Sequence, residues 1–105
     1  MSLIYHVTTA AQWADALKNG AYETSSLAHE GFIHCSTGNQ VGGVLERYFA
    51  GRHDLVSLVI EPGLLKSKLQ YDRSDLMNED FPHIYGPVNL EAVICAEEIL
   101  SPPGP

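Results

Sequence analysis

The run Leu55-Val56-Ser57-Leu58-Val59-Ile60 is the strongest strand signal in the chain. A strand with one wet face alternates apolar and polar residues, whereas a strand buried on both faces is apolar almost throughout. This run is nearly continuously apolar, so we predict a strand in the interior of a sheet. Glu61-Pro62-Gly63 ends it, because proline and glycine favour a turn over a continued strand.

A first helix is predicted directly after the N-terminal strand. Thr9, followed three residues later by Gln12, has the form of a capping box. Gly20 stands where a helix ending at about Asn19 takes a left-handed residue. The expected buried stripe of this helix consists of Trp13, Leu17 and the alanines.

A second helix is predicted from a cap at Thr37 or Asn39 to about Phe49. Its apolar positions recur at helical spacing and consist of Val41, Val44, Leu45, Tyr48 and Phe49. Gly42 and Gly43 weaken the start of this helix by about 1 kcal/mol each relative to alanine.

The other segments complete an α+β domain. Further strands are expected at residues 3–8, 32–36, 69–72 and 92–100. We also expect an irregular stretch at 21–30, an exposed mobile loop at 73–80 and a frayed tail at 101–105. This order of elements lacks regular βαβ alternation. We therefore predict one α+β domain over residues 1–100, with two helices packed on a mostly antiparallel sheet.

Composition narrows the partners that this chain is expected to have. The 105 residues carry a formal net charge of −7, with only six lysines and arginines to neutralise phosphates, so long-range binding to nucleic acid is not expected. A basic-plus-apolar leader is absent from the sequence, and so is an apolar run of about 18 residues, so we expect no membrane partner and a cytoplasmic location. Cys35 and Cys95 lie in apolar strand-like runs, so we expect both thiols to be buried and reduced.

Three strand-like segments, far apart in the sequence, each carry a histidine followed two residues later by a hydroxyl. Residues two apart on a strand point to the same face, so each segment presents an imidazole and a hydroxyl together. The pairs are His6 with Thr8, His34 with Ser36, and His83 with Tyr85. We predict that the three strands line one cleft, with the histidines as candidate catalytic residues and the hydroxyls as candidate ligand-binding groups. His29 and His53 lie outside this pattern.

Two kinds of site fit such a set of side chains. Three neutral imidazoles with one open position are a known catalytic zinc layout, with Glu30 or Asp72 available to orient a ligand. However, the sequence lacks the His-x-His or His-x-x-x-His spacing that places two ligands on one element. We therefore favour a metal-free pocket in which imidazoles and hydroxyls hold a polar small molecule. Ser36 as a nucleophile lacks the Gly-x-Ser-x-Gly context.

The same segments resemble the signatures of the domain-of-unknown-function 952 family. The resemblance rests on Tyr5-His6-x-Thr8, on the run from Glu30 to Ser36, and on Phe81-Pro82-His83-Ile84-Tyr85-Gly86-Pro87. Gln40 and the aromatic pair Tyr48-Phe49 also fall where the family has similar residues. Asp72 stands where many relatives are expected to have a glutamate. By this resemblance Gln40 and Asp72 join the candidate ligand-binding residues.

That family resembles the ADP-ribosyltransferase superfamily in fold, which implies a split, mostly antiparallel sheet. In the superfamily a first-strand histidine, in a context like Tyr5-His6-x-Thr8, grips the nicotinamide-side ribose of NAD. The resemblance implies this role for His6, with Thr8 close by. The strand whose aromatic residue stacks on nicotinamide corresponds to the one that carries His34 here. Where the superfamily has a catalytic glutamate, this chain offers His83 and Tyr85.

Two functions of different class follow from this resemblance. The first is an enzyme, or a remnant of one, that acts on NAD or a related nucleotide. The second is a non-catalytic module that binds a small ligand in the same pocket. The group that separates them is a general acid or base within reach of the ligand, for which Glu30, Asp72 and the histidines are the candidates.

Overall fold

The computed structural model of the chain describes residues 2–99. In it, the apolar run Leu55–Ile60 forms β5, an interior strand of a four-stranded sheet. The sheet is antiparallel, with the order β4 (Ser36–Thr37), β1 (Ile4–Thr9), β5 and β9 (Val93–Glu98). Leu58 and Ile60 have no solvent exposure. The predicted interior position of this strand is confirmed.

Helix α1 (Ala10–Asn19) begins and ends at the predicted residues. The backbone N–H of Gln12 donates to the Thr9 hydroxyl at 3.1 Å, and Gly20 closes the helix in the left-handed conformation, with φ of 87°. The buried stripe of α1 is narrower than predicted. Ala16 is buried and Trp13 packs partly against the core, but Leu17 is 56% exposed, so it lies outside the side of α1 that contacts β1, β2 and β5.

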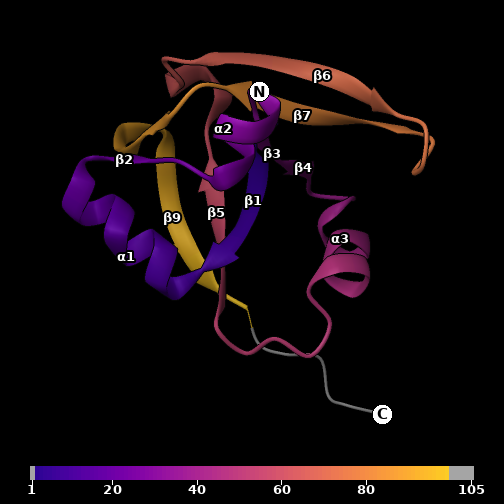
Figure 1. Cartoon of the computed structure of the whole chain (residues 1–105), viewed down its shortest axis with the longest axis horizontal. Coiled ribbons are helices and arrows are strands. Elements are labelled where there is room, and N and C mark those ends of the chain that lie inside the picture. Colours follow the sequence, from indigo (N-terminus) through magenta and orange to yellow (C-terminus); the bar gives the residue numbers. More distant parts are fainter. Residues whose placement is uncertain (1, 100–105) are drawn as a thin grey trace.

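A second sheet has three strands, in the order β3 (Ile33–His34), β7 (Glu79–Tyr85) and β6 (Lys68–Ser74). The prediction of a loop over residues 73–80 is wrong in its extent. Antiparallel pairing continues to Ser74 opposite Glu79, so only residues 75–78 form the turn of a long hairpin. Cross-strand hydrogen bonds pair this polar segment. In Figure 1 the hairpin lies across one end of the main sheet.

The remaining elements are short. They are β2 (Ala21–Tyr22) paired with β8 (Val88–Asn89), α2 (Ser25–Glu30), α3 (Val41–Tyr48), and the 3₁₀ turns Pro62–Leu64 and Leu90–Ala92. The described part of the chain is thus an α+β fold with mostly antiparallel sheets and three α-helices, one more than predicted. Helix α3 follows Gln40 without a side-chain cap at Thr37 or Asn39.

The segment 32–36 is not the continuous strand that the sequence predicts. It changes partner at Cys35: His34 pairs with His83 in one sheet, and Ser36 pairs with Tyr5 in the other. The Cys35 N–H donates to the Pro82 carbonyl at 3.0 Å at the change. The alternation of faces is therefore interrupted, and His34 is exposed while Ser36 is buried.

The two thiols differ in environment. Cys35 is 4% exposed and belongs to the core, as predicted, but Cys95 is exposed, because it lies on β9 at the edge of the main sheet. Within residues 2–99, none of the helices has the length and apolar character needed to cross a membrane. The tail expected at 101–105 lies outside the described residues.

Candidate functional site

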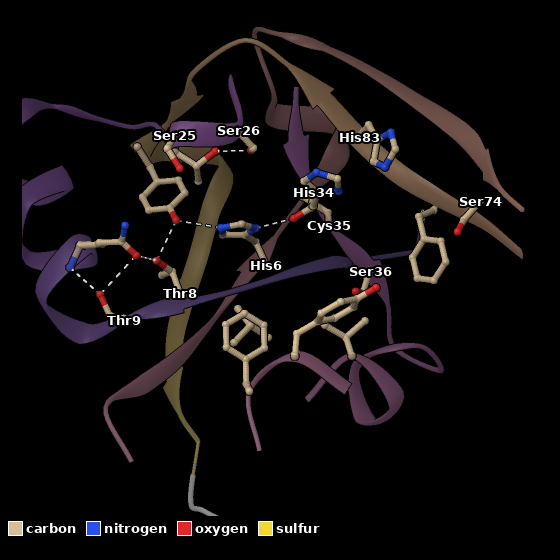
Figure 2. A pocket seen from close by; sticks show the side chains of 18 of the residues that line it. His6, Thr8, Thr9, Ser25, Ser26, His34, Cys35, Ser36, Ser74 and His83 are labelled. Atoms are coloured by element: carbon tan, nitrogen blue, oxygen red, sulfur yellow. Dashed lines mark hydrogen bonds between the residues drawn. The ribbon is translucent and has the colours of Figure 1, made fainter. Parts of the chain in front are cut away.

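A cavity of about 680 Å³ opens between the main sheet, α3 and the β6–β7 hairpin. His6, His34 and His83 all line it, together with Thr8 and Ser36. Figure 2 shows these five side chains among those that surround the cavity. Ligand pockets commonly have volumes of about 300–1,000 Å³, so the cavity is large enough for a small organic ligand.

The lining of the cavity differs in charge from the rest of the chain. The chain has thirteen Asp and Glu against six Lys and Arg, yet within residues 2–99 the cavity lining includes Arg52 and Arg73 and no carboxylate. The apolar part of the lining is aromatic and aliphatic, with Val44, Tyr48, Phe49, Met77 and Phe81 among its members. The cavity thus combines an apolar wall with cationic and hydroxyl groups.

His6 is bonded to the protein through both ring nitrogens. Nδ1 lies 2.5 Å from the His34 carbonyl oxygen, which only accepts, so Nδ1 carries a proton. Nε2 lies 2.8 Å from the Tyr22 hydroxyl, which in turn lies 2.7 Å from the Thr8 hydroxyl. Thr8 donates to the Gln12 side-chain oxygen at 2.8 Å. Figure 2 shows this chain of bonds along one side of the cavity.

Burial sets the protonation of this chain of groups. Burial of His6 lowers its pKa to about 4, although the bond to the His34 carbonyl acts in the opposite direction. Burial also raises the pKa of Tyr22 to about 12. Burial therefore disfavours the charged form of each group, and the contacts of His6 join β1 to β2 and β3.

His34 is held by an acid on the preceding helix. Its Nε2 lies 2.8 Å from the carboxylate of Glu30 at the end of α2, and both side chains are about half exposed. The hydrogen bond from His34 lowers the pKa of Glu30. Within residues 2–99 the Nδ1 atom of His34 has no protein hydrogen bond.

His83 is held more firmly, by an acid on the neighbouring strand. Its Nδ1 lies 2.8 Å from Asp72, and the two side chains are 13% and 25% exposed. Asp72 also accepts hydrogen bonds from the Gln70 amide and the Tyr85 hydroxyl. These three bonds, with that from Gln70 the largest contributor, lower the pKa of Asp72 to about 2. The carboxylate therefore stays ionised and keeps a proton on Nδ1 of His83.

Phe32 fixes the planes of the two outer histidines. Its ring stacks on His83, with centroids 4.1 Å apart and an interplanar angle of 15°, and it meets the His34 ring edge-on at 4.9 Å. The His34 and His83 centroids are 5.2 Å apart. Both imidazoles are thus fixed in position at one end of the cavity.

Three predicted ligand-binding residues do not line the cavity. Asp72 and Tyr85 lie behind His83, where they contact it or each other. The Gln40 amide is engaged by the protein: its oxygen accepts from the Thr37 N–H at 3.0 Å, and its nitrogen donates to the Asp80 carbonyl at 2.9 Å. Gln40 therefore joins the start of α3 to the hairpin.

Four residues at the site were not predicted from the sequence. The sequence places Tyr22 in an irregular stretch, Phe32 on a strand and Arg73 in a loop, and it singles out neither these residues nor Arg52 as part of a site. The chain is acidic and has few cations, which is a reason to consider each arginine as a binding residue. However, nothing in the sequence shows that Arg52 and Arg73 line the same cavity. Within residues 2–99, the His, Cys, Asp and Glu side chains form no group of three that could hold a metal ion.

Comparison with known proteins supports the family that the motifs suggest. The family model described as "Protein of unknown function (DUF952)" matches residues 7–96. The chain belongs to the DUF952 family. A search of curated proteins finds no match.

Solved structures of protein CC0527 from Caulobacter crescentus are similar to this DUF952 chain. The crystal structure is 31% identical with a TM-score of 0.84, and the match covers 92% of this chain and 85% of that one. The solution structure is 31% identical with a TM-score of 0.82, covering 95% and 86%. Sequence motifs and fold thus agree over nearly the whole DUF952 chain.

Proposed function

We propose that the cavity binds a small anionic ligand of the nucleotide type, with NAD as the first candidate. The observation that carries this proposal is the separation of charge: Arg52 and Arg73 line the cavity of a strongly acidic chain, and the described lining includes no carboxylate. A cavity lined by charges of one sign attracts a ligand of the opposite sign and raises its local concentration.

Each of the two arginines is in an exposed ion pair whose carboxylate a ligand anion can replace. Arg52 is bonded to Asp54 at 3.0 and 2.8 Å, and Arg73 lies 3.7 Å from Asp80, with side chains about half exposed in both pairs. Exposed pairs of this kind contribute little to stability because water competes for both partners. A phosphate can therefore replace part of each arginine–aspartate interaction at little cost to the stability of the fold.

The rest of the lining suits the other parts of a nucleotide. Aromatic side chains offer stacking surfaces for a base. Ser36 offers a hydroxyl to a ribose, and the Thr8 oxygen can accept one further hydrogen bond. The resemblance to ADP-ribosyltransferases favours NAD among nucleotides. Both ring nitrogens of His6 already bond to the protein, so in this proposal His6 supports ribose binding by holding Tyr22 and Thr8 in place.

Binding of NAD, AMP and uncharged adenosine, measured by thermal shift and calorimetry, tests the proposal. We expect NAD and AMP to bind, adenosine to bind more weakly, and added salt to weaken the two anions. Arg52→Gln and Arg73→Gln should each reduce AMP affinity. Arg47→Gln is the matched control, because it removes the same charge from α3 outside the lining. Equal binding of adenosine and AMP, or equal effects of all three substitutions, would contradict the proposal.

A further inference from the structure

The histidines of the cavity differ in which ring nitrogens the protein uses. His6 has both nitrogens bonded to protein groups. His34 and His83 each have one nitrogen on a carboxylate, and within residues 2–99 the other nitrogen has no protein hydrogen bond. A carboxylate at one nitrogen fixes the tautomer and leaves the opposite nitrogen to give or take a proton.

Two such imidazoles, 5.2 Å apart between ring centroids, lie at the same end of the cavity. Phe32 holds both rings, and Arg73 follows Asp72 directly on β6. Arg73 lines the same cavity as His34 and His83, so a phosphate held by Arg73 lies in the cavity that contains both imidazoles. Acid–base cleavage of a phosphate ester needs a cation that positions the phosphate and two oriented groups that transfer protons. Arg73 and the two imidazoles are groups of these kinds.

We propose that His83 and His34 are the general base and the general acid of a phosphodiester-cleaving site. This inference rests on the proposed binding of a phosphate-bearing ligand. His83 Nε2 takes a proton from a water molecule while the water oxygen forms a bond to phosphorus. The bond from phosphorus to the ester oxygen breaks, and that oxygen takes a proton from Nδ1 of His34. The products are a phosphomonoester and an alcohol, and proton exchange with solvent restores both imidazoles.

The surroundings of the two rings decide which is the base. His83 is mostly buried and donates from Nδ1 to Asp72, an arrangement that presents a lone pair on Nε2. His34 is half exposed, and the Glu30 carboxylate at its Nε2 balances the charge of an imidazolium, the form that a general acid needs. The charged and titratable groups that face the pair are Glu30, His6, Asp72 and Tyr85.

Two substrates with different leaving groups separate the two roles. The 2′,3′-cyclic phosphate of adenosine releases an alkoxide, which needs a proton from the acid. Bis(4-nitrophenyl) phosphate releases 4-nitrophenolate, which leaves without one. We expect the chain to hydrolyse both, with kcat/KM for the cyclic phosphate falling at both acidic and alkaline pH, because one imidazole must be neutral and the other protonated.

Substitution should then distinguish base from acid. His83→Gln should lower both rates by about 100-fold or more, because both reactions need the base. His34→Gln should lower hydrolysis of the cyclic phosphate by about 100-fold but that of bis(4-nitrophenyl) phosphate by less than about 10-fold, and should remove the alkaline limb of the pH profile. His29→Gln, which changes a histidine outside the lining, should leave both rates unchanged.

Asp72→Asn provides a second variant that keeps the shape of the side chain. As a positioning residue for His83, Asp72 should affect kcat for both substrates and leave KM and AMP affinity unchanged. Binding of AMP or NAD with no hydrolysis of either substrate would overturn the acid–base inference alone. Hydrolysis that survives in His83→Gln would overturn it as well. Absence of nucleotide binding would remove the proposed function and this inference together.

Discussion

The Tyr22 hydroxyl lies 2.8 Å from Nε2 of His6, in a part of the core where neither side chain is more than 8% exposed. Through this bond the short strand β2 contacts the first strand of the main sheet. The same hydroxyl donates its proton to the Thr8 oxygen at 2.7 Å, so one phenol contacts two buried polar groups. The contact explains why a tyrosine, rather than a phenylalanine, occupies this core position.

Tyr22→Phe should therefore destabilise the fold without creating a cavity. It leaves Nε2 of His6 and the Thr8 hydroxyl short of a buried partner, which costs about 1–3 kcal/mol. Urea unfolding monitored by circular dichroism measures the change. Tyr48→Phe is the control, because Tyr48 is 60% exposed, and it should be close to neutral. Equal stability of the two variants would mean that the hydrogen bonds of Tyr22 carry no net free energy.

The free energy of unfolding should fall as the pH is lowered from about 6.5 toward 4. His6 binds a proton in the unfolded chain near its ordinary pKa of 6.5, but in the folded chain only at about 4. The unfolded state therefore holds more protons in this window and is favoured there. The difference between the two pKa values corresponds to about 3 kcal/mol, all of it present above pH 6.5.

Urea unfolding at several pH values tests this, with His6→Asn as the comparison. The variant should be less stable at pH 7, because it loses the bonds to Tyr22 and His34, but its stability should vary less between pH 6.5 and 5. The acids with lowered pKa, Glu30 and Asp72 among them, titrate below this range. An unchanged slope in the variant would assign the pH dependence to other groups.

The two cysteines should react with thiol reagents at very different rates. Burial raises the pKa of Cys35 far above its ordinary value, so its reactive thiolate is scarce and inaccessible, whereas Cys95 is exposed. One equivalent of Ellman's reagent should be consumed by the folded chain and a second only in denaturant. Cys95→Ser should abolish the first equivalent. Rapid consumption of both in the native state would show that the core around Cys35 opens readily.

Two glycine-to-alanine substitutions should have opposite signs. Gly20 has φ of 87°, where an alanine is strained, so Gly20→Ala should destabilise by about 1 kcal/mol although the space beside it is open. Gly42 lies inside α3 with nothing within 4 Å of an added Cβ, so Gly42→Ala should stabilise by about 0.5–1 kcal/mol. Thermal melting of both variants provides the comparison, and a shared sign would contradict it.

The parts of the fold that sequence predicted well are those specified by local signals. The unbroken apolar run of β5 and the cap residues Thr9 and Gly20 each determine their element through nearby chemistry. The hairpin at 68–85 was underestimated because its polar residues form a strand only when the partner strand supplies hydrogen bonds. At Cys35 the chain passes from one sheet to the other, through contacts with Pro82 and Tyr5. These residues are distant in sequence, so the spacing of residues 32–36 does not predict the change.

The site was predictable to a similar extent. The spacing of histidine and hydroxyl selected His34 and His83, which lie together, but it could not show that both nitrogens of His6 are engaged by the protein. That distinction depends on Tyr22, a residue 16 positions away that carries no motif. The arginines of the lining meet only through the tertiary fold. Catalytic and binding roles for these residues stay predictions.

The tip of the β6–β7 hairpin contributes Arg73 and Met77 to the cavity, while its turn, with Leu76 77% exposed, contributes little to the core. The part of the cavity lining that the hairpin supplies thus lies outside the four strands of the main sheet. Residues 75–78 can change in length or chemistry while β1, β5 and β9 keep their register. A substitution at Met77 can therefore reshape this edge of the cavity with little effect on the free energy of unfolding.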